Sequence, residues 1–123
     1  MKLNKIEKME WKDVSDPGAE KVKIKIVLGE PEGAPNFIMR VFEVAPGGNT
    51  PRHSHNWEHE IFVLAGKGVA FANGKDHPVE PGDALLIPPN EEHQFRNENS
   101  APFKFICLIP KVGVRSSHFT LTI

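Results

Sequence analysis

Apolar and polar residues alternate over several short stretches of the chain, at the two-residue period of a half-buried strand. The stretch EKVKIKIVLG, residues 20–29, places aliphatic side chains on one side and lysines on the other. A second strand is expected over NFIMRVFEVA, residues 36–45, and the triplet Pro46-Gly47-Gly48 is expected to turn the chain after it.

The second half of the chain carries further strands between turn signals. EIFVLA, residues 60–65, and GVAFA, residues 68–72, flank the link Gly66-Lys67, which predicts a hairpin. Asn73-Gly74 tolerates the positive φ of a tight hairpin turn, and Pro81-Gly82 has the residue order of a type II turn. The remaining expected strands are ALLIP, residues 84–88, HQFRN, residues 93–97, and PFKFICLIP, residues 102–110.

This pattern predicts an all-β, antiparallel sandwich or barrel. The 11 prolines and 10 glycines are spread along the chain and leave no helical pattern of ten residues between the short strands. A closed barrel would leave few strand edges exposed. With 123 residues, no repeat and no linker, the sequence predicts a single domain over residues 1–123. Residues 113–123 are expected to form either one more strand or a tail that pairs with a neighbouring subunit.

Composition narrows the classes of partner. Apolar residues make up 39% and charged residues 25%, as in a globular protein, and the formal net charge is -1. No long basic run attracts nucleic acid or anionic lipid, so neither is an expected partner, whereas a small neutral or anionic ligand is. The single cysteine, Cys107, cannot form an intrachain disulfide, and the charged start MKLNKIEKMEWKD lacks the apolar run of a signal peptide. We therefore expect a cytoplasmic protein.

One segment concentrates groups that bind metals. RHSHNWEHE, residues 52–60, holds three of the six histidines of the chain. On an unbroken strand His53, His55 and His59 would share one face, and Glu58 and Glu60 would lie on the other. Three close imidazoles without a metal would cost stability, and neutral imidazole is a common ligand of transition metals. The segment therefore predicts a metal site, with exposed loop histidines as the alternative.

Two stretches resemble the motifs of the cupin family and together span about half of the chain. Residues 46–68 resemble the first cupin motif, G-x5-H-x-H-x3,4-E-x6-G, with one residue fewer before the closing glycine. Residues 81–97 resemble the second motif, G-x5-P-x-G-x2-H-x3-N, with Asn90 in place of a glycine. The residues in matching positions are Gly47, His53, His55, Glu60 and Gly66 in the first motif, and Gly82, Pro88, His93 and Asn97 in the second. The resemblance implies a double-stranded β-helix, or jelly-roll barrel, with its core at about residues 36–110.

The resemblance also implies a set of metal ligands. His59 occupies the shorter of the two glutamate positions of the first motif, as in small single-domain cupins whose metal is held by four histidines. A manganese-binding bacterial subgroup carries a similar H-x-H-x-W-E-H-E segment. The implied ligands are His53, His55, His59 and His93, around one divalent transition metal ion. Manganese is the first expectation, and iron, nickel, copper and zinc are alternatives. Glu60 is an alternative ligand, which would need a bulge to reach the ligand face.

Three residues are expected to border a substrate pocket. The odd positions of residues 102–110 are apolar, which favours an inward face that carries Phe105 and Cys107. Cys107 would then lie near the metal or serve as a buried structural thiol. If Arg40 also faces inward, its guanidinium needs an anionic partner, either a glutamate or a bound carboxylate. His77 and His118 lack donors at ligand spacing and are excluded from the site.

The expected function is that of a metal-dependent oxidoreductase of dioxygenase type, acting on a small organic molecule. The alternatives are a non-catalytic metal-binding or ligand-binding cupin, and a metal-dependent isomerase or decarboxylase. No residue identifies a general base. A homodimer is expected, in which an exchanged N-terminal strand would bury the apolar face of residues 22–28.

Overall fold

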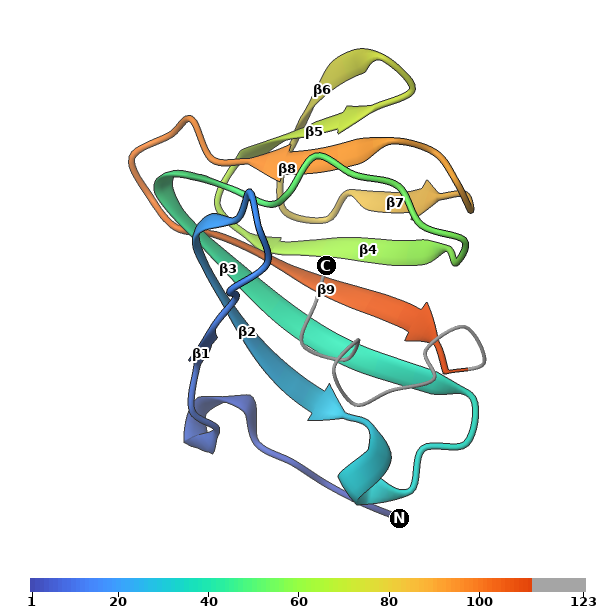
Figure 1. Cartoon of the computed structure of the whole chain (residues 1–123). Coiled ribbons are helices and arrows are strands. Elements are labelled where there is room, and N and C mark those ends of the chain that lie inside the picture. Colours follow the sequence, from blue (N-terminus) through green and yellow to red (C-terminus); the bar gives the residue numbers. More distant parts are fainter. Residues whose placement is uncertain (112–123) are drawn as a thin grey trace.

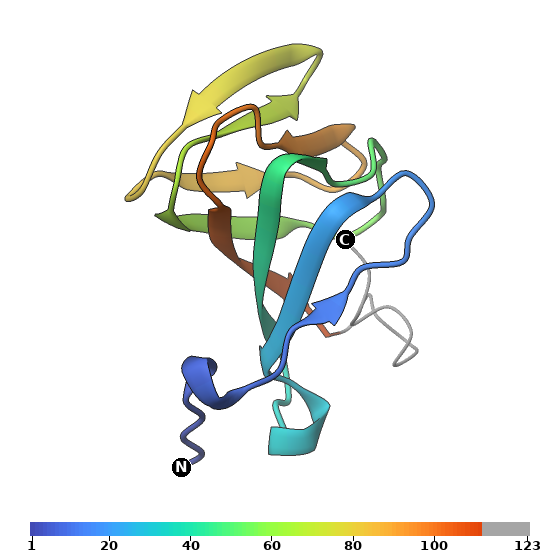
Figure 2. The ribbon, with the colours of Figure 1, turned by 90° about the vertical axis from the view of Figure 1, so that its left-hand side faces the viewer.

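The computed structural model of the chain describes residues 1–111 (Figures 1 and 2). The expectations for residues 113–123, including His118, lie outside the described residues. The strands are β1 (Lys12–Asp13), β2 (Glu20–Leu28), β3 (Phe37–Asn49), β4 (His59–Ala65), β5 (Gly68–Ala72), β6 (Lys75–Val79), β7 (Ala84–Ile87), β8 (His93–Arg96) and β9 (Phe103–Pro110). Two short 3-10 turns, η1 (Ile6–Lys8) and η2 (Glu30–Glu32), flank β1 and β2. Among these residues no helix has the length and apolar character needed to cross a membrane.

The strands form one curled antiparallel sheet with the order β6-β5-β8-β3-β9-β4-β7. β2 pairs with β3 between Met39 and Asn49, and β1 pairs with β2. Figure 1 shows β5, β6 and β8 above β9, β3 and β2, with β4 and β7 between them, and Figure 2 shows the sheet folding back on itself. The expected all-β, antiparallel jelly-roll barrel is confirmed.

β3 joins the two halves of the barrel by a bend. It pairs with β9 as far as Val44, and after the bend Asn49 pairs with Arg96 of β8 as well as with Glu20 of β2. Gly47, with φ at 82°, makes the bend, and its N–H donates to the carbonyl of Asn97 at 2.9 Å. The turn expected at residues 46–48 is therefore wrong, because these residues keep their backbone pairing and the strand continues to Asn49.

The hairpin expected between residues 60–65 and 68–72 is also wrong. β4 pairs with β7 and β9, whereas β5 pairs with β6 and β8, so the Gly66-Lys67 link crosses from one half of the barrel to the other. Gly66 has φ at 71°, and a Cβ there would collide with the carbonyl of Pro102. The close hairpin is instead β5–β6, at the expected Asn73-Gly74 turn, where Ala72 pairs with Lys75.

β2 is covered within its own chain. Val22 and Ile24 are buried and lie opposite Val44 and Phe42 of β3. In this single chain the apolar face of β2 packs on β3 of the same chain, and the exchange of an N-terminal strand between subunits stays a prediction. On the other face, Lys25 is buried beneath the N-terminal segment, where its Nζ donates to the carbonyl of Ile6 at 2.8 Å.

Aromatic side chains fill the interior beside the histidines. Phe103, Phe105, Cys107 and Ile109 of β9 are all buried, which confirms the expected inward face of that strand. The ring of Phe105 lies 5.4 Å from that of Phe42 and 4.9 Å from that of Phe95. Burial of each such ring contributes about 2 kcal/mol to stability. Because the rings are closely packed, they form a rigid apolar surface beside the histidines.

Candidate metal centre

The histidines of the first motif reach the interior by way of a loop. Residues 50–58 connect β3 and β4 and run along β8. The N–H of Thr50 donates to the carbonyl of Phe95, and the N–H of Phe95 donates to Oγ1 of Thr50, both at 2.8 Å. His53 then forms an isolated antiparallel bridge with His93. One unbroken strand through His53, His55 and His59 is therefore wrong, because the first two lie in the loop and only His59 belongs to β4.

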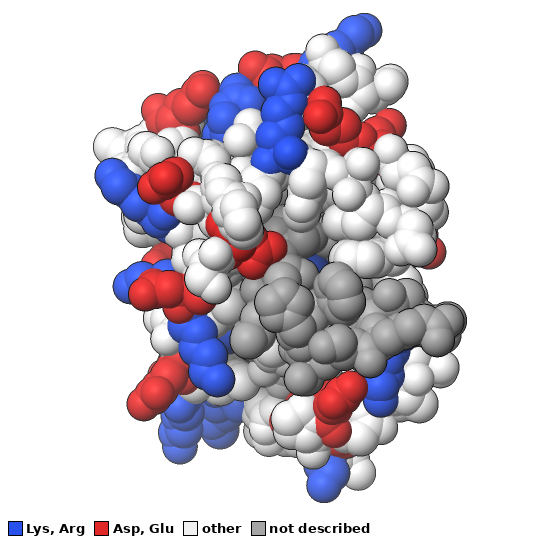
Figure 3. Space-filling model, in the orientation of Figure 1, with Lys and Arg blue, Asp and Glu red and all other residues white. Residues whose placement is uncertain are grey.

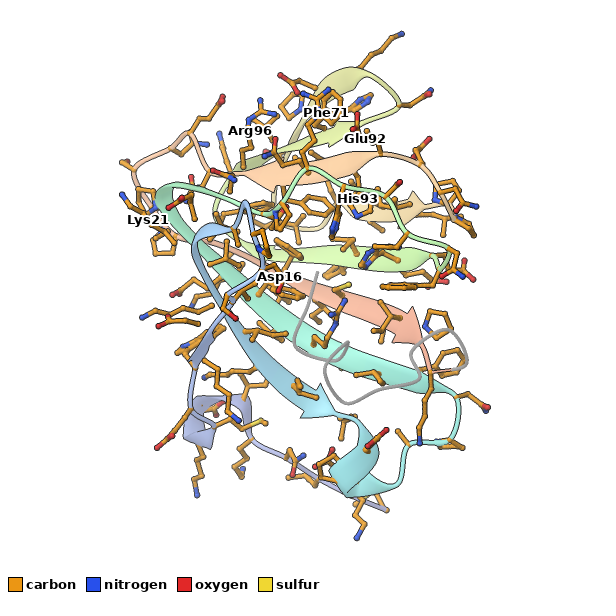
Figure 4. All side chains as sticks on the ribbon, in the orientation of Figure 1. Asp16, Lys21, Phe71, Glu92, His93 and Arg96 are labelled. Atoms are coloured by element: carbon orange, nitrogen blue, oxygen red, sulfur yellow. The ribbon has the colours of Figure 1, made fainter. Side chains whose placement is uncertain are left out.

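Four imidazole rings from three parts of the chain lie together in the interior. The ring centroids of His55 are 5.1 Å from His53, 4.5 Å from His59 and 4.9 Å from His93. His93 lies 5.0 Å from His53 and 5.1 Å from His59. Figure 4 shows His93 on the inner side of β8, facing β4, whereas Arg96 and Phe71 lie on its outer side. The ligand nitrogens of His53, His55 and His93 lie within 4.8 Å of one another, and Nε2 of His59 is 2.6 Å from Nε2 of His55.

Backbone carbonyls orient two of the rings. Nδ1 of His55 lies 2.8 Å from the carbonyl oxygen of Trp57, and the His55 ring stacks on the Trp57 indole at 4.1 Å. Nδ1 of His93 lies 2.8 Å from the carbonyl oxygen of Glu91. Since a carbonyl oxygen can only accept, each Nδ1 carries the hydrogen, and Nε2 of the neutral ring is left with a lone pair.

The Nε2 atom of His93 gives the most direct indication of a cation. It is buried and has no hydrogen-bond partner among residues 1–111. A buried lone pair that meets no donor costs free energy, and the cost is removed by a bound positive ion. The donor set therefore fits a transition metal ion, for which imidazole nitrogen is a common ligand.

Burial keeps two of the rings neutral. Desolvation lowers the pKa of His59 well below its ordinary value, and the positive charge of Arg40 and the neighbouring histidines lower it further. Desolvation also lowers the pKa of His93, against an opposing hydrogen bond to the Glu91 backbone. Both rings are therefore in the unprotonated form that a metal requires at neutral pH.

Behind His59 lies a buried contact between Cys107 and Arg40. The sulfur of Cys107 is 2.8 Å from Nδ1 of His59, and Nη2 of Arg40 donates to the same sulfur at 3.1 Å. Arg40 is 0% exposed and lies over the Phe42 ring, so the inward orientation that the sequence left open is decided. Burial raises the pKa of the Cys107 thiol, which is therefore neutral at neutral pH.

The other candidates from the sequence differ in whether their side chains face the interior or the outside of the barrel. Glu58 and Glu60 are exposed, and Glu60 lies on the outer face of β4 between Leu86 and Leu108, so its carboxylate points away from the rings. His77 is exposed on β6. Phe105 is buried on the inner face of β9, two residues from Cys107.

Sequence reasoning missed the partners that orient the rings. The carbonyls of Trp57 and Glu91 have no sequence signature, because every residue carries a carbonyl group. The Arg40–Cys107 contact follows from register, since these residues are paired directly across β3 and β9. That register is set by the packing of the barrel and cannot be read from either strand alone.

Residues 40–109 match the family described as Cupin domain. The oxalate-binding protein of Thermotoga maritima is 34% identical over 68 residues, which cover 54% of this chain and 56% of that protein. The 1-methylthio-D-xylulose 5-phosphate methylsulfurylase of Rhodospirillum rubrum is 34% identical over 71 residues, covering 58% of this chain and 46% of that protein. The matched region thus spans about half the length of these curated relatives.

Solved structures show the same arrangement over most of the chain. The polyketide cyclase RemF from Streptomyces resistomycificus is 35% identical with a TM-score of 0.85, and the match covers 89% of this chain and 79% of that one. A Thermotoga maritima protein described as a predicted oxalate decarboxylase is 25% identical with a TM-score of 0.79, and the match covers 89% of this chain and 98% of that one.

Proposed function

The chain belongs to the cupin family, and from that premise we propose that it is a metal-dependent enzyme acting on a small, oxygen-bearing organic molecule. The proposed ligands of one divalent ion are His53, His55, His59 and His93, and manganese is the first expectation. The observation that carries the proposal is the convergence of these rings, with the buried Nε2 of His93 lacking a hydrogen-bond partner among residues 1–111. A single domain over residues 1–123 is part of this proposal.

The ligand set determines what substrate such a centre would favour. Four neutral imidazoles leave the charge of a divalent ion uncompensated, so a bound ion supplies Lewis acidity that favours an anionic or enolate-like oxygen. The aromatic cluster around Phe105 excludes water from the inner side of the rings. Stacking on Trp57 holds the His55 ring in one orientation.

Two reaction classes fit this proposal. The first is the dioxygenase-type oxidation expected from the sequence. The second is a cyclisation without redox change, supported by the 35% identity to a polyketide cyclase over 89% of this chain. A non-catalytic ligand-binding protein is the alternative function, favoured by the 34% identity to an oxalate-binding protein. An isomerase or decarboxylase is a further alternative.

Metal analysis of protein purified without a histidine tag tests the proposal. We expect about one metal ion per chain, lost in His93→Ala and kept in His77→Ala, whose ring is exposed on β6. Dioxygen consumption with phenols and diketones would identify the dioxygenase class, and cyclisation of polyketones without dioxygen consumption would identify the second class. Metal loading with oxalate binding and no turnover would favour the non-catalytic alternative. Absence of metal from the wild-type protein, even after incubation with Mn²⁺, Fe²⁺ and Zn²⁺, would refute the proposal.

We also propose a homodimer, formed through an outer patch on β4, β7 and β9. The outward positions of a sheet that faces water are usually polar. Here they are apolar, with Phe62 45%, Leu64 41% and Leu86 60% exposed. The outer patch consists of Phe62, Leu64, Ala84, Leu86, Ile106 and Leu108, which neighbour one another across the three strands.

A second copy of this chain matches the outer patch in charge. Glu60 lies at one end of the patch, and Lys104, whose Nζ lies 3.5 Å from Oε1 of Glu43, lies at the other. A two-fold axis in the interface, running across the strands, places Glu60 of each copy over Lys104 of the other, where it would share this ammonium group with Glu43. Acidic and basic side chains are interspersed around the face shown in Figure 3, in keeping with the formal net charge of -1.

The buried thiol of Cys107 is compatible with a reducing compartment, and the cytoplasm remains our prediction.

A further inference from the structure

The imidazole of His59 is held by a side chain from another strand. Its Nδ1 lies 2.8 Å from the sulfur of Cys107, and both residues are 1% exposed. Cys107 pairs with Ile61 across β4 and β9, so its sulfur lies on the inner face beside the strand position of His59. The contact is therefore built by the register of two long strands.

His55 and His93 are oriented in a different way. Their Nδ1 atoms each meet the carbonyl oxygen of a residue two positions away in the same segment, at 2.8 Å. A carbonyl belongs to the backbone and survives any substitution. At His59 the sulfur takes the place of that carbonyl, so the orientation of this ring depends on the identity of one residue.

Arg40 also contacts the sulfur of Cys107. Its Nη2 donates to the Cys107 sulfur at 3.1 Å, and Arg40 is paired with Cys107 across β3 and β9. A guanidinium group can only donate, so this bond uses one lone pair of the sulfur and leaves the other for a second donor. Nδ1 of His59 is the second atom within hydrogen-bonding distance of the sulfur.

We propose that Cys107 is a positioning residue for the metal centre, whose sulfur accepts Nδ1–H of His59 and thereby presents Nε2 of that ring to the ion. This inference rests on the proposed function, because it assigns a consequence to metal binding. With Nδ1–H bonded to sulfur, the Nε2 lone pair of His59 faces Nε2 of His55, which lies 2.6 Å away. A partner that orients a metal-bound histidine typically contributes about 10-fold to 100-fold to metal affinity.

Metal titration of full-length variants tests the role of the sulfur. Cys107→Val keeps an apolar side chain of similar size and removes the acceptor, so we expect affinity for Co²⁺ about 10-fold to 100-fold weaker than that of the wild type. Cys107→Ser supplies an oxygen acceptor and is expected to recover most of the affinity. Val63→Ala, a buried position further along β4, is the matched control that loses core packing and keeps wild-type affinity.

A spectroscopic readout separates positioning from a general loss of structure. In Co²⁺-loaded protein the N–H proton of a metal-bound imidazole gives a shifted, exchangeable NMR signal. The signal of His59 is expected to exchange with solvent much faster in Cys107→Val and to be unchanged in Val63→Ala. Wild-type affinity and an unchanged signal in Cys107→Val would overturn the inference while leaving the metal centre in place. A wild-type protein that binds no metal would refute the proposed function itself.

Discussion

His53 and His93 bond to each other through their backbones: the N–H of each donates to the carbonyl of the other, at 3.1 and 2.9 Å. This isolated bridge joins the loop before β4 to the first residue of β8. Two segments that are far apart in the chain are thus held together without any contribution from the imidazole rings. Substitution of a histidine side chain should therefore leave the scaffold intact, which makes the metal centre accessible to mutagenesis.

Metal ions are expected to stabilise the wild-type protein and to have a much smaller effect on His93→Ala. An ion that binds the folded chain alone raises the free energy of unfolding by about 2.7 kcal/mol at a concentration 100 times its Kd. Thermal unfolding with and without Mn²⁺ or Zn²⁺ measures this difference. His77→Ala is the control and should respond as the wild type does, because His77 is exposed on β6. An equal response of His93→Ala would exclude His93 as a ligand.

The metal-free protein is expected to lose stability below about pH 6.5. Burial lowers the folded-state pKa of His59 and His93 from the ordinary value of 6.5. Above that pH both rings are neutral in the folded and unfolded states. As the pH falls below it, the unfolded chain takes up protons that the folded chain does not, so the free energy of unfolding decreases by up to ~1.4 kcal/mol per pH unit for each ring.

Urea unfolding of chelator-treated protein between about pH 7.5 and about pH 5.5 measures this slope. A His59→Gln variant supplies the comparison, because it lacks one of the two buried imidazoles and should show a shallower slope. A wild-type protein whose stability does not change over this range would contradict the assignment of low pKa values to these rings.

Gly66→Ala is expected to destabilise the fold more than Gly74→Ala does. Both glycines have positive φ, at 71° and 73°. An added Cβ at Gly66 would collide with the backbone of Pro102, whereas nothing lies within 4 Å of the corresponding position at Gly74. Gly74→Ala therefore carries only the backbone strain of about 1–2 kcal/mol, and Gly66→Ala carries the steric cost as well. Chemical denaturation of the two variants side by side measures the difference, and equal losses would contradict the collision.

Asn97→Ala is expected to lower stability by about 2–4 kcal/mol and to leave metal affinity unchanged. The Asn97 side chain is 1% exposed, and its Nδ2 donates to the carbonyls of Val44 at 2.9 Å and Ala101 at 2.8 Å. Its Oδ1 accepts from the N–H of Asn99 at 2.9 Å. This variant should therefore unfold at a lower temperature than the wild type, while its metal titration matches that of the wild type. Asn99→Ala, which replaces an exposed side chain, is the comparison.

Phe62→Glu is expected to convert a dimer into monomers. A charge in the centre of the outer patch would lose its hydration on association and meet an apolar surface. Light scattering at micromolar concentration measures the mass, and the unfolding transition shows whether the variant folds. Glu10→Gln, an exposed substitution outside the patch, should keep the wild-type mass. A monomeric wild-type protein at that concentration would contradict the proposed assembly.

The strands were predictable from the sequence where apolar and polar residues alternate with a two-residue period. The alternation in residues 20–29 and 102–110 corresponds to β2 and β9, because in a sheet with one buried face the side chains alternate regardless of which strands are neighbours. β6, Lys75–Val79, was not expected, since its first four residues are all exposed and carry no such alternation. The apparent hairpin at Gly66-Lys67 failed for a related reason: two adjacent strands and a short link do not reveal that each strand pairs with more distant partners.

The amino-acid sequence by itself determined the all-β class, the positions of most strands and, through the two motifs, the histidines that are the candidates for the metal centre. These are properties of local pattern, which residue type and spacing express directly. Only the tertiary structure decided that Arg40 and Cys107 stand behind His59, that Glu60 faces outward, and that the loop before β4 brings His53 and His55 to β8. Those relationships depend on register between strands that are distant in the chain, and register is set by the packing of the whole barrel rather than by any single segment.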